Sequence, residues 1–389
     1  MDEIRIVFMS LIYLDNNATT VIDPEVANAM QACHQLGLVN PESQHQLGRQ
    51  ARRQLEDCRE QLGVLLGLHL SDVHADHLFF TSGGTEANNL AIQGYRLGAD
   101  AKNRLVISGI EHPSISTTAQ WLRSQGVDVQ IVNTLTNGLI DCEHLESLVN
   151  HDTFLVAVML ANNETGVIQP ISNVVAICDR LGVPVHADAV QAIGKLDVQF
   201  RELGVGSMTV SAHKVHGPRG SGALITRHGH APHPVFHGGF QQSAVRPGTE
   251  SVALAAGLTT AVSNYLGDKD DHVSRLLALR DRFETGIKTQ LANAQVLGAD
   301  APRLPNTSNI AFRGVDRQAM LMALDVAGVC CSTGSACASG SSEPSPTLVA
   351  MGLDPELIEG ALRFSLGIFN TEPEIDDAIE RICAVASVL

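Results

Sequence analysis

From residue 77 onward, short apolar runs alternate with segments that are long enough to form helices. The runs are residues 78–80, 105–107, 129–132, 154–159 and 183–186. This alternation is typical of a largely parallel sheet with helices on both faces, because each parallel connection needs a crossover helix. We therefore predict an α/β fold, in which a ligand binds at the carboxyl ends of the strands.

The composition suits a globular protein with a large aliphatic core. The 389 residues are 44% hydrophobic but only 4% aromatic, and the formal net charge is −16. This acidic balance, without any basic run, argues against a general nucleic-acid binder, which neutralises phosphates with Lys and Arg. No apolar stretch approaches the roughly 20 residues that a membrane-spanning helix needs.

The N-terminus begins with the acidic segment 1–4 and lacks the charged-then-apolar pattern of a signal peptide. We therefore expect a cytoplasmic protein, and Met9 is an alternative start because the structured-looking sequence begins near Ile12. The eight cysteines show no CxxC spacing. Neither a disulfide framework nor a zinc site is expected from them.

Lys214 lies in a short polar segment between the apolar runs 208–210 and 222–225. A lysine in a dry loop at the end of a strand can lose its proton, and the neutral amine can form a Schiff base with an aldehyde cofactor. A solvated surface lysine is the alternative. The interpretation therefore depends on the polar residues that follow the other apolar runs.

Two groups of polar residues at predicted strand ends suit such a cofactor. Gly83, Gly84 and Thr85 precede a helix whose N–H groups can bind phosphate, although an ordinary strand-to-helix turn has the same pattern. Asp188 can keep a pyridine nitrogen protonated, as a carboxylate does in pyridoxal-phosphate enzymes, or it can cap a helix. Gln191 can donate to the phenolic oxygen of the same ring.

Histidines are the third group, and the chain has 16 of them. His112 also follows an apolar run, so its ring can stack on a flat cofactor and carry protons, or it can be a structural histidine. Two other groups of histidines are candidate ligands for a metal ion. No carboxylate or cysteine spacing completes such a site, so none is expected. These groups are His213 with His216, and His228 with His230, His233 and His237.

Seven motifs occur in an order that resembles a known family. They are residues 13–20, 81–86, 111–112, 162–166, 186–191, 211–214 and 246–250. Together they resemble the pyridoxal-phosphate cysteine desulfurases of the NifS/IscS type, in the class V aminotransferase family. The resemblance runs from about residue 12 to the C-terminus.

The resemblance implies the fold and its division into domains. It implies fold type I of the pyridoxal-phosphate enzymes, with a mostly parallel seven-stranded sheet covered by helices and a smaller α+β domain. Residues 16–266 are expected to form the large cofactor-binding domain. Residues 1–15 and 267–389 are expected to form the small domain, which carries the catalytic cysteine loop.

The roles that the resemblance implies for the cofactor agree with the chemistry of the strand ends. Lys214 is expected to be the Schiff-base lysine and to move protons, Asp188 the partner of the ring nitrogen, and Gln191 that of the ring oxygen. His112 is expected to stack on the ring and to act in acid and base steps. The residues expected to hold the phosphate are Gly84, Thr85, Ser211 and His213.

The resemblance also implies a substrate site and a second subunit. Asn163 and Arg363 are expected to hold the carboxylate of L-cysteine, since the planar fork of arginine matches a carboxylate. Thr249 is expected to reach the cofactor phosphate of the neighbouring subunit, which implies a homodimer with shared sites.

Cys337 is the best candidate for a reactive thiol, because the segment 330–342 is rich in Gly, Ser and Ala and offers no bulky neighbours. The resemblance makes it the persulfide carrier. Pro346 stands where relatives commonly have His or Tyr. Five of the other cysteines are expected to be inert in apolar helices or strands, and the remaining two are expected to be strand residues at the end of an apolar run. They are Cys33, Cys58, Cys142, Cys178 and Cys383, and then Cys330 and Cys331.

The expected activity is removal of sulfur from L-cysteine, giving L-alanine and a persulfide on Cys337. The sulfur is then expected to pass to an acceptor protein for iron–sulfur cluster assembly or thiolation. A selenocysteine or cysteine-sulfinate lyase, an aminotransferase and a catalytically silent scaffold are the alternatives. The acceptor stays open between an iron–sulfur scaffold, a transfer-RNA thiolation enzyme and a nitrogenase pathway.

Overall fold

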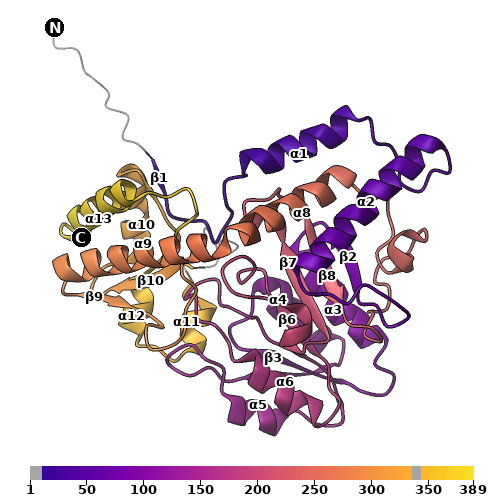
Figure 1. Ribbon diagram of the computed structural model, residues 1–389. Coiled ribbons are helices and arrows are strands. Elements are labelled where there is room, and N and C mark those ends of the chain that lie inside the picture. The colour runs from indigo at the N-terminus through magenta and orange to yellow at the C-terminus, as the bar shows by residue number, and fades with distance from the viewer. Residues whose placement is uncertain (1–10, 335–342) are drawn as a thin grey trace.

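A seven-stranded sheet forms the centre of the computed structural model, which describes residues 11–334 and 343–389 (Figure 1). Its strand order is β2-β8-β7-β6-β5-β3-β4. Strands β4, β3, β5, β6 and β7 run parallel to one another, and β8 is antiparallel to both β7 and β2. The strands are β2 (His77–Thr81), β3 (Arg104–Ser108), β4 (Asp128–Val132), β5 (Thr153–Ala157), β6 (Val185–Asp188), β7 (Ser207–Ser211) and β8 (Gly222–Thr226).

The predicted α/β fold is therefore confirmed, and each apolar run contributes to a strand. The run 154–159 continues two residues beyond β5, and β6 begins two residues after the start of the run 183–186. The helical segments around this sheet are α1 (Pro24–Gln35), α2 (Gln46–Leu65), α3 (Gly84–Leu97), α4 (Pro113–Ser124), α5 (Cys142–Leu148), α6 (Ile171–Asp179), α7 (Phe200–Leu203), η1 (Ala212–Lys214), η2 (Gln241–Ala244) and α8 (Val252–Gly267).

Helices cover both faces of the sheet, as the side chains of β3 show. Leu105 and Ile107 pack in a core with α3 and α4. Val106, which lies between them, packs in the opposite core with α2, α5, α6 and α8. Successive side chains of a strand point to opposite faces, so a strand between two helical layers is apolar on both sides. This explains why the strands are continuous apolar runs rather than alternating ones.

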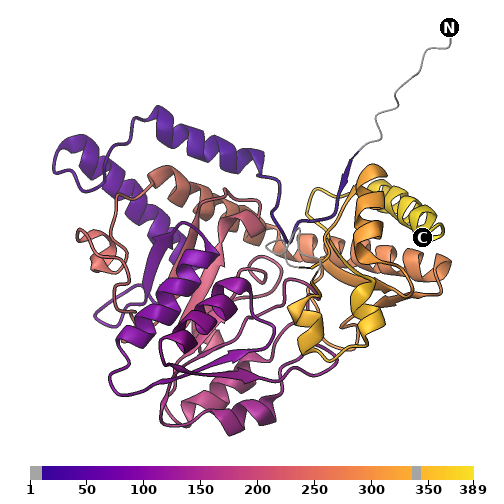
Figure 2. The same ribbon diagram turned by 180° about the vertical axis from the view of Figure 1, so that it is seen from behind.

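The C-terminal part of the chain forms a second lobe, coloured orange and yellow beside the sheet in Figures 1 and 2. It contains an antiparallel sheet of order β12-β10-β9 and a parallel pair of β1 with β11. Its elements are β1 (Ile12–Tyr13), α9 (Lys269–Gln290), β9 (Ala294–Val296), β10 (Thr307–Phe312), α10 (Arg317–Val326), β11 (Val329–Cys330), α11 (Pro346–Ala350), α12 (Pro355–Glu359), β12 (Ala361–Ser365) and α13 (Glu372–Ala386).

The N-terminal strand belongs to the core of this second lobe. Ile12 and Leu14 are buried there together with Phe283 of α9 and Phe364 of β12. Beyond β1, Asp15 forms a parallel bridge with Ser365, and the chain then runs toward the carboxyl ends of the large sheet. The loop 15–20 therefore connects the two cores. The domain boundaries drawn at residues 15 and 267 stay a prediction.

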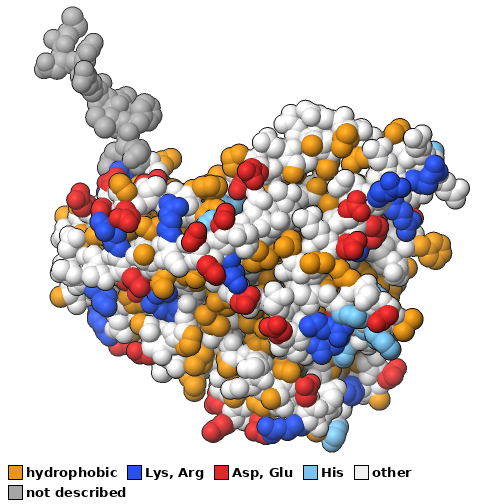
Figure 3. All heavy atoms as spheres, viewed as in Figure 1, with side chains coloured by type: hydrophobic (Ala, Val, Ile, Leu, Met, Phe, Trp, Pro, Cys, Tyr) orange, Lys and Arg blue, Asp and Glu red, His pale blue; other side chains and the backbone are white. Residues whose placement is uncertain are grey.

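The surface carries charges of both signs. On the face shown in Figure 3, Lys and Arg side chains are interspersed with Asp and Glu. None of the helices within residues 11–334 and 343–389 has the length and apolar content to cross a membrane.

Candidate active site

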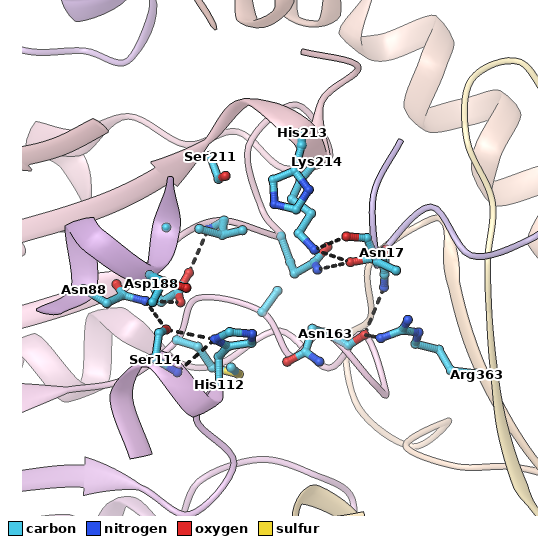
Figure 4. Close-up of a pocket in the computed structure, with 17 residues that line it drawn as sticks. Asn17, Asn88, His112, Ser114, Asn163, Asp188, Ser211, His213, Lys214 and Arg363 are labelled. Atoms are coloured by element: carbon cyan, nitrogen blue, oxygen red, sulfur yellow. Dashed lines mark hydrogen bonds between the residues drawn. The ribbon is translucent and has the colours of Figure 1, made fainter. Parts of the chain in front are cut away.

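A cavity of about 180 Å³ lies at the carboxyl ends of the central strands (Figure 4). All the predicted site residues line it except Thr249 and Cys337. They are Gly84, Thr85, His112, Asn163, Asp188, Gln191, Ser211, His213, Lys214 and Arg363. Cys337 lies outside the described residues. Residues at the ends of five strands of the central sheet, or in the segments that follow them, thus meet in one place, as expected for the carboxyl edge of an open α/β sheet. Arg363 joins them from within β12 of the smaller sheet.

Lys214 ends the short helix η1, which directly follows β7. Its Nζ donates to the backbone oxygens of Asn17 at 2.5 Å and Ala18 at 2.7 Å, so the amine faces the N-terminal loop across the cavity. A fully buried second lysine lies behind it. The Nζ of Lys195 donates to the backbone oxygen of Gln191 at 3.1 Å, and burial, with Lys214 nearby, lowers the pKa of Lys195 to about 7.

Asp188 is the last residue of β6 and is buried. Its Oδ1 accepts from the backbone N–H of Val190 at 3.0 Å, within a turn. The alternative interpretation of Asp188 as a helix cap is therefore wrong. Its Oδ2 accepts from Nδ2 of Asn88 on α3 at 2.8 Å, and the same amide group donates to Ser114.

His186 extends this hydrogen-bonded chain into the core. Its Nε2 lies 3.0 Å from Oδ1 of Asn88, and its Nδ1 lies 2.8 Å from Oγ of Ser207. Because Nδ2 of Asn88 is the donor to Asp188, its Oδ1 must accept, so Nε2 of His186 carries the proton. Burial lowers the pKa of His186 to about 3, which keeps the ring neutral. The carboxylate of Asp188 thus has a fixed orientation toward the cavity.

His112 precedes α4 and caps it. Its Nδ1 accepts from the backbone N–H of Ser114 at 3.1 Å, so in the neutral ring the proton is on Nε2. Burial lowers the pKa of His112, Asp188 opposes this shift, and Lys214 adds to it. Figure 4 shows the ring between Asp188 and Asn163. The neutral ring therefore has an Nε2–H group that can donate a proton within the cavity.

The start of α3 and the end of β7 form the other end of the cavity. Gly83 has a φ of +146°, which favours glycine, and a Cβ there would lie 3.9 Å from Oγ of Ser211. That hydroxyl is buried and has no hydrogen-bond partner within the described residues. The helix start and this unpaired hydroxyl together suit a phosphate. Nδ1 of His213 lies 3.2 Å from Oγ1 of Thr19, and burial lowers the pKa of His213 to about 3.

Arg363 reaches the cavity from β12 of the second lobe, and its side chain is only 1% exposed. Its Nη2 donates to Oδ1 of Asp15 at 2.6 Å, and its Nη1 donates to the backbone oxygen of Asn163 at 3.2 Å. Its Nε is buried and has no acceptor among the residues that the structure describes. One edge of the guanidinium is thus paired by the protein, and a donor remains for an anion.

Three residues with clear positions in the site were missed by sequence reasoning about single residues. Asn17 receives donors from Lys214 and from Gln191, whose Nε2 lies 3.0 Å from its backbone oxygen. Oε1 of Gln191 has no partner within the described residues. Asn88 orients Asp188, and Asp15 pairs with Arg363. Asn17 and Asp15 lie in the motif 13–20, and Asn88 lies one helical turn after Gly84, which was the available signal.

Thr249 is exposed and lies in a separate hollow with Arg246 and Glu86, which form an ion pair at 2.7 Å.

Two expectations for the C-terminal lobe can also be compared with the structure. Cys330 ends β11, but Cys331 lies one residue beyond the strand, so that part of the expectation is wrong. Pro346 is the first residue of α11, a position that tolerates proline because its missing N–H is not needed there.

The family profile for class-V aminotransferases matches residues 12–377. The chain is 36% identical to cysteine desulfurase NifS of Azotobacter vinelandii over 98% of its own length and 94% of that protein. It is 40% identical to an IscS-like cysteine desulfurase of Mycobacterium tuberculosis, covering 95% and 94% of the two chains. A solved structure described as a NifS-like protein has a TM-score of 0.89 and 32% identity, covering 97% of this chain and 100% of that one.

Proposed function

Because this chain belongs to the NifS/IscS-type cysteine desulfurases of the class-V aminotransferase family, we propose that it removes sulfur from L-cysteine and releases L-alanine. The sulfur remains on Cys337 as a persulfide until an acceptor protein takes it. Enzymes of this family depend on pyridoxal 5′-phosphate.

The main support for this proposal is the cavity, because it contains buried polar atoms that have no hydrogen-bond partner in the protein. Within the described residues these are Oγ of Ser211, Oε1 of Gln191 and Nε of Arg363. A buried polar group without a hydrogen bond costs about 1–3 kcal/mol. Three such atoms around one cavity indicate that a polar ligand supplies their partners. Their positions fit a cofactor whose phosphate lies at Ser211, together with a substrate whose carboxylate lies at Arg363.

Each end of the cofactor has a candidate partner. Ser211, Gly84, Thr85 and His213 would hold the phosphate, and Lys214 would attach to the aldehyde carbon. When bound, the cofactor supplies a protonated ring that withdraws electrons from the Cα of the amino-acid substrate. The carboxylate of Asp188, oriented by Asn88, would hold the proton of the ring nitrogen.

The remaining residues would act on the substrate and on protons. Nε and Nη atoms of Arg363 would bind the carboxylate of cysteine, with Asn163 beside it. Once displaced, the amine of Lys214 would remove the proton from Cα of the substrate. His112, whose pKa is lowered by burial, would donate the proton of Nε2 and later take one back there. The thiolate of Cys337 would then attack the sulfur atom of the substrate, so that an S–S bond forms as the Cβ–S bond breaks. The electron pair of the broken bond would stay with the carbon fragment, which takes up protons and leaves as L-alanine.

We also propose a homodimer and a cytoplasmic location. Thr249 is exposed and lies outside the cavity of its own chain, next to the ion pair of Arg246 with Glu86. These positions are consistent with a contact to the phosphate bound by a second subunit. The acceptor would be an iron–sulfur scaffold or a thiolation enzyme, which the persulfide reaches by direct protein contact.

A Cys337→Ala variant tests the activity. We expect no persulfide after incubation with L-cysteine, measured by mass spectrometry of the alkylated peptide, whereas borohydride still fixes the cofactor to Lys214. A Cys142→Ala variant, which changes a partly buried cysteine at the start of α5, is the matched control and should keep full activity. Sulfide release that continues unchanged in Cys337→Ala would refute the assignment of the nucleophile.

A further inference from the structure

Glu164 is a buried carboxyl group that none of the roles above uses. It follows Asn163 in the turn after β5, and it is only 2% exposed. The turn is fixed by Oδ1 of Asn162, which accepts from the backbone N–H groups of Glu164 and Thr165, both at 2.9 Å. The position of Glu164 is therefore set by the same turn that carries Asn163 to the substrate end of the cavity.

Both carboxylate oxygens of Glu164 bind the segment that follows residue 342. Oγ of Ser345 donates to Oε2 at 2.5 Å, and Oγ1 of Thr347 donates to Oε1 at 3.1 Å. Ser345 is also the cap of α11, since its Oγ accepts from the backbone N–H of Leu348 at 3.2 Å. A five-residue helix is not stable by itself. The start of α11 is thus held by its cap and by Glu164.

The same carboxylate touches the chain on the other side of the segment 335–342. A Cβ on Gly334 would lie 3.1 Å from Oε2 of Glu164, and Gly334 has a φ of +146°. Only glycine allows the backbone to pass this close to the carboxylate without strain. Just before it, the backbone of Ser332 pairs with that of Arg363 through two hydrogen bonds of 2.7 and 3.1 Å. One carboxyl group therefore lies against both stems of the segment that contains Cys337.

The burial of this group has a cost that its hydrogen bonds only partly offset. Burial raises the pKa of Glu164, while Ser345, Arg363 and Thr347 lower it. Packing alone does not require a buried carboxyl group, because replacing both partners of a buried hydrogen bond by apolar groups of the same shape can be nearly neutral for stability. Two hydroxyl donors that meet it with good geometry indicate instead that the position of the stems is what the group determines.

We propose that Glu164 is a positioning residue for sulfur transfer, which holds the two stems of the segment 335–342 at the substrate end of the cavity. This inference rests on the proposed function, because it assumes that Cys337 is the sulfur acceptor. It adds that the turn 162–165 joins substrate binding, through Asn163 and Arg363, to the placement of the attacking thiol.

The test separates sulfur transfer from the earlier proton transfer. Proton exchange at Cα of L-alanine in deuterated water, followed by NMR, reports on Lys214 and Arg363 but does not need Cys337. In a Glu164→Ala holoenzyme we expect this exchange and the affinity for cysteine to stay within about twofold of wild type. Formation of the Cys337 persulfide in a single turnover should fall about 10- to 100-fold, since a displacement near 1 Å can cost about 10²-fold.

Two milder variants protect the test against misfolding. Thr347→Val removes one hydroxyl without changing the shape of the side chain and should slow persulfide formation about two- to fivefold, as expected for one hydrogen bond of about 0.5–1 kcal/mol. Hydrogen exchange of the amides of α11 should be faster in Glu164→Ala, with or without the cofactor. A Glu143→Ala variant, on the exposed side of α5, is the control and should match wild type in every measurement.

Two results would overturn the inference. One is persulfide formation at the wild-type rate in Glu164→Ala. The other is an equal loss of proton exchange and persulfide formation, which would make Glu164 a structural residue of the whole cavity. A wild-type enzyme that exchanges the Cα proton but forms no persulfide on Cys337 would refute the proposed function itself, and this is recognised without any Glu164 variant.

Discussion

The cofactor side of the cavity comes from strand ends of one sheet, whereas the substrate side is assembled from three distant parts of the chain. Asp188 and Lys214 follow the adjacent strands β6 and β7. Arg363, by contrast, lies on β12 of the second lobe and pairs with Asp15 from the N-terminal loop. The first side is therefore supported by one lobe, and the second depends on contacts between two lobes.

The two sides also differ in how their ionisable groups are satisfied. The carboxylate of Asp188 is held by a closed chain of hydrogen bonds that continues through Asn88 and His186 to Ser207. Arg363 is held by one ion pair and one backbone oxygen. Changes on the cofactor side should therefore alter the chemical step, and changes on the substrate side should alter cysteine binding.

Lys214→Ala should cause the largest loss of activity. An effect on cysteine binding alone would contradict the distinction between the cofactor side and the substrate side. The variant lacks the amine that we propose to attach the cofactor and to move the Cα proton, and such proton transfer is worth about 10²–10⁴-fold in rate. We expect kcat for alanine formation to fall at least about 10³-fold. Borohydride should no longer fix the cofactor to the protein. Lys288→Ala, which changes an exposed lysine of α9, should behave as wild type in both assays.

Arg363→Ala should show the opposite pattern, with a smaller total effect. Loss of the guanidinium removes the donors that we propose for the substrate carboxylate, and it also removes the partner of the Asp15 carboxylate in their ion pair. We expect KM for L-cysteine to rise about 100-fold, corresponding to the 2–5 kcal/mol typical of a broken charge pair, while kcat changes less. The exposed pair of Arg282 with Asp376 offers the control, since Arg282→Ala should leave KM unchanged. A kcat effect larger than the KM effect would contradict the division of roles.

The smallest expected effect comes from His186→Gln. It concerns the pH dependence of folding stability and tests the hydrogen-bonded chain on the cofactor side. The folded protein keeps His186 neutral, with a pKa of about 3 instead of the usual 6.5. Between these two values the unfolded chain binds a proton that the folded protein does not bind, so stability falls as the pH falls from about 6.5 to 3. His186→Gln should remove this contribution of up to about 1.4 kcal/mol per pH unit.

Urea unfolding at several pH values measures this difference between the variant and wild type. The other buried histidines, such as His213 and His216, are present in both proteins and cancel in the comparison. A stability difference that stays constant between pH 6.5 and 4 would show that His186 is protonated in the folded protein.

The same contrast explains which parts of the site the sequence predicted. Asp188, Lys214 and His112 follow apolar runs, and the edge where parallel strands end is a general binding place. Asn88 was missed because a residue inside a helix reaches the site only when the orientation of that helix is known. The ion pair of Asp15 with Arg363 joins residues that are far apart in the sequence, so no local sequence pattern predicts it. The roles of the predicted site residues all stay predictions. Among them, Thr249 does not line the described cavity, and Cys337 lies outside the described residues.

The pairing of β1 with β11 has a consequence for how the protein is made. Ile12 leaves the ribosome long before its partner Val329, because almost the whole large sheet lies between them in the sequence. The core of the second lobe, and with it the pair that positions Arg363, can close only after β11, β12 and α13 have been synthesised. Until then the first strand has an unpaired edge and exposed apolar side chains, which are the features that chaperones recognise in nascent chains.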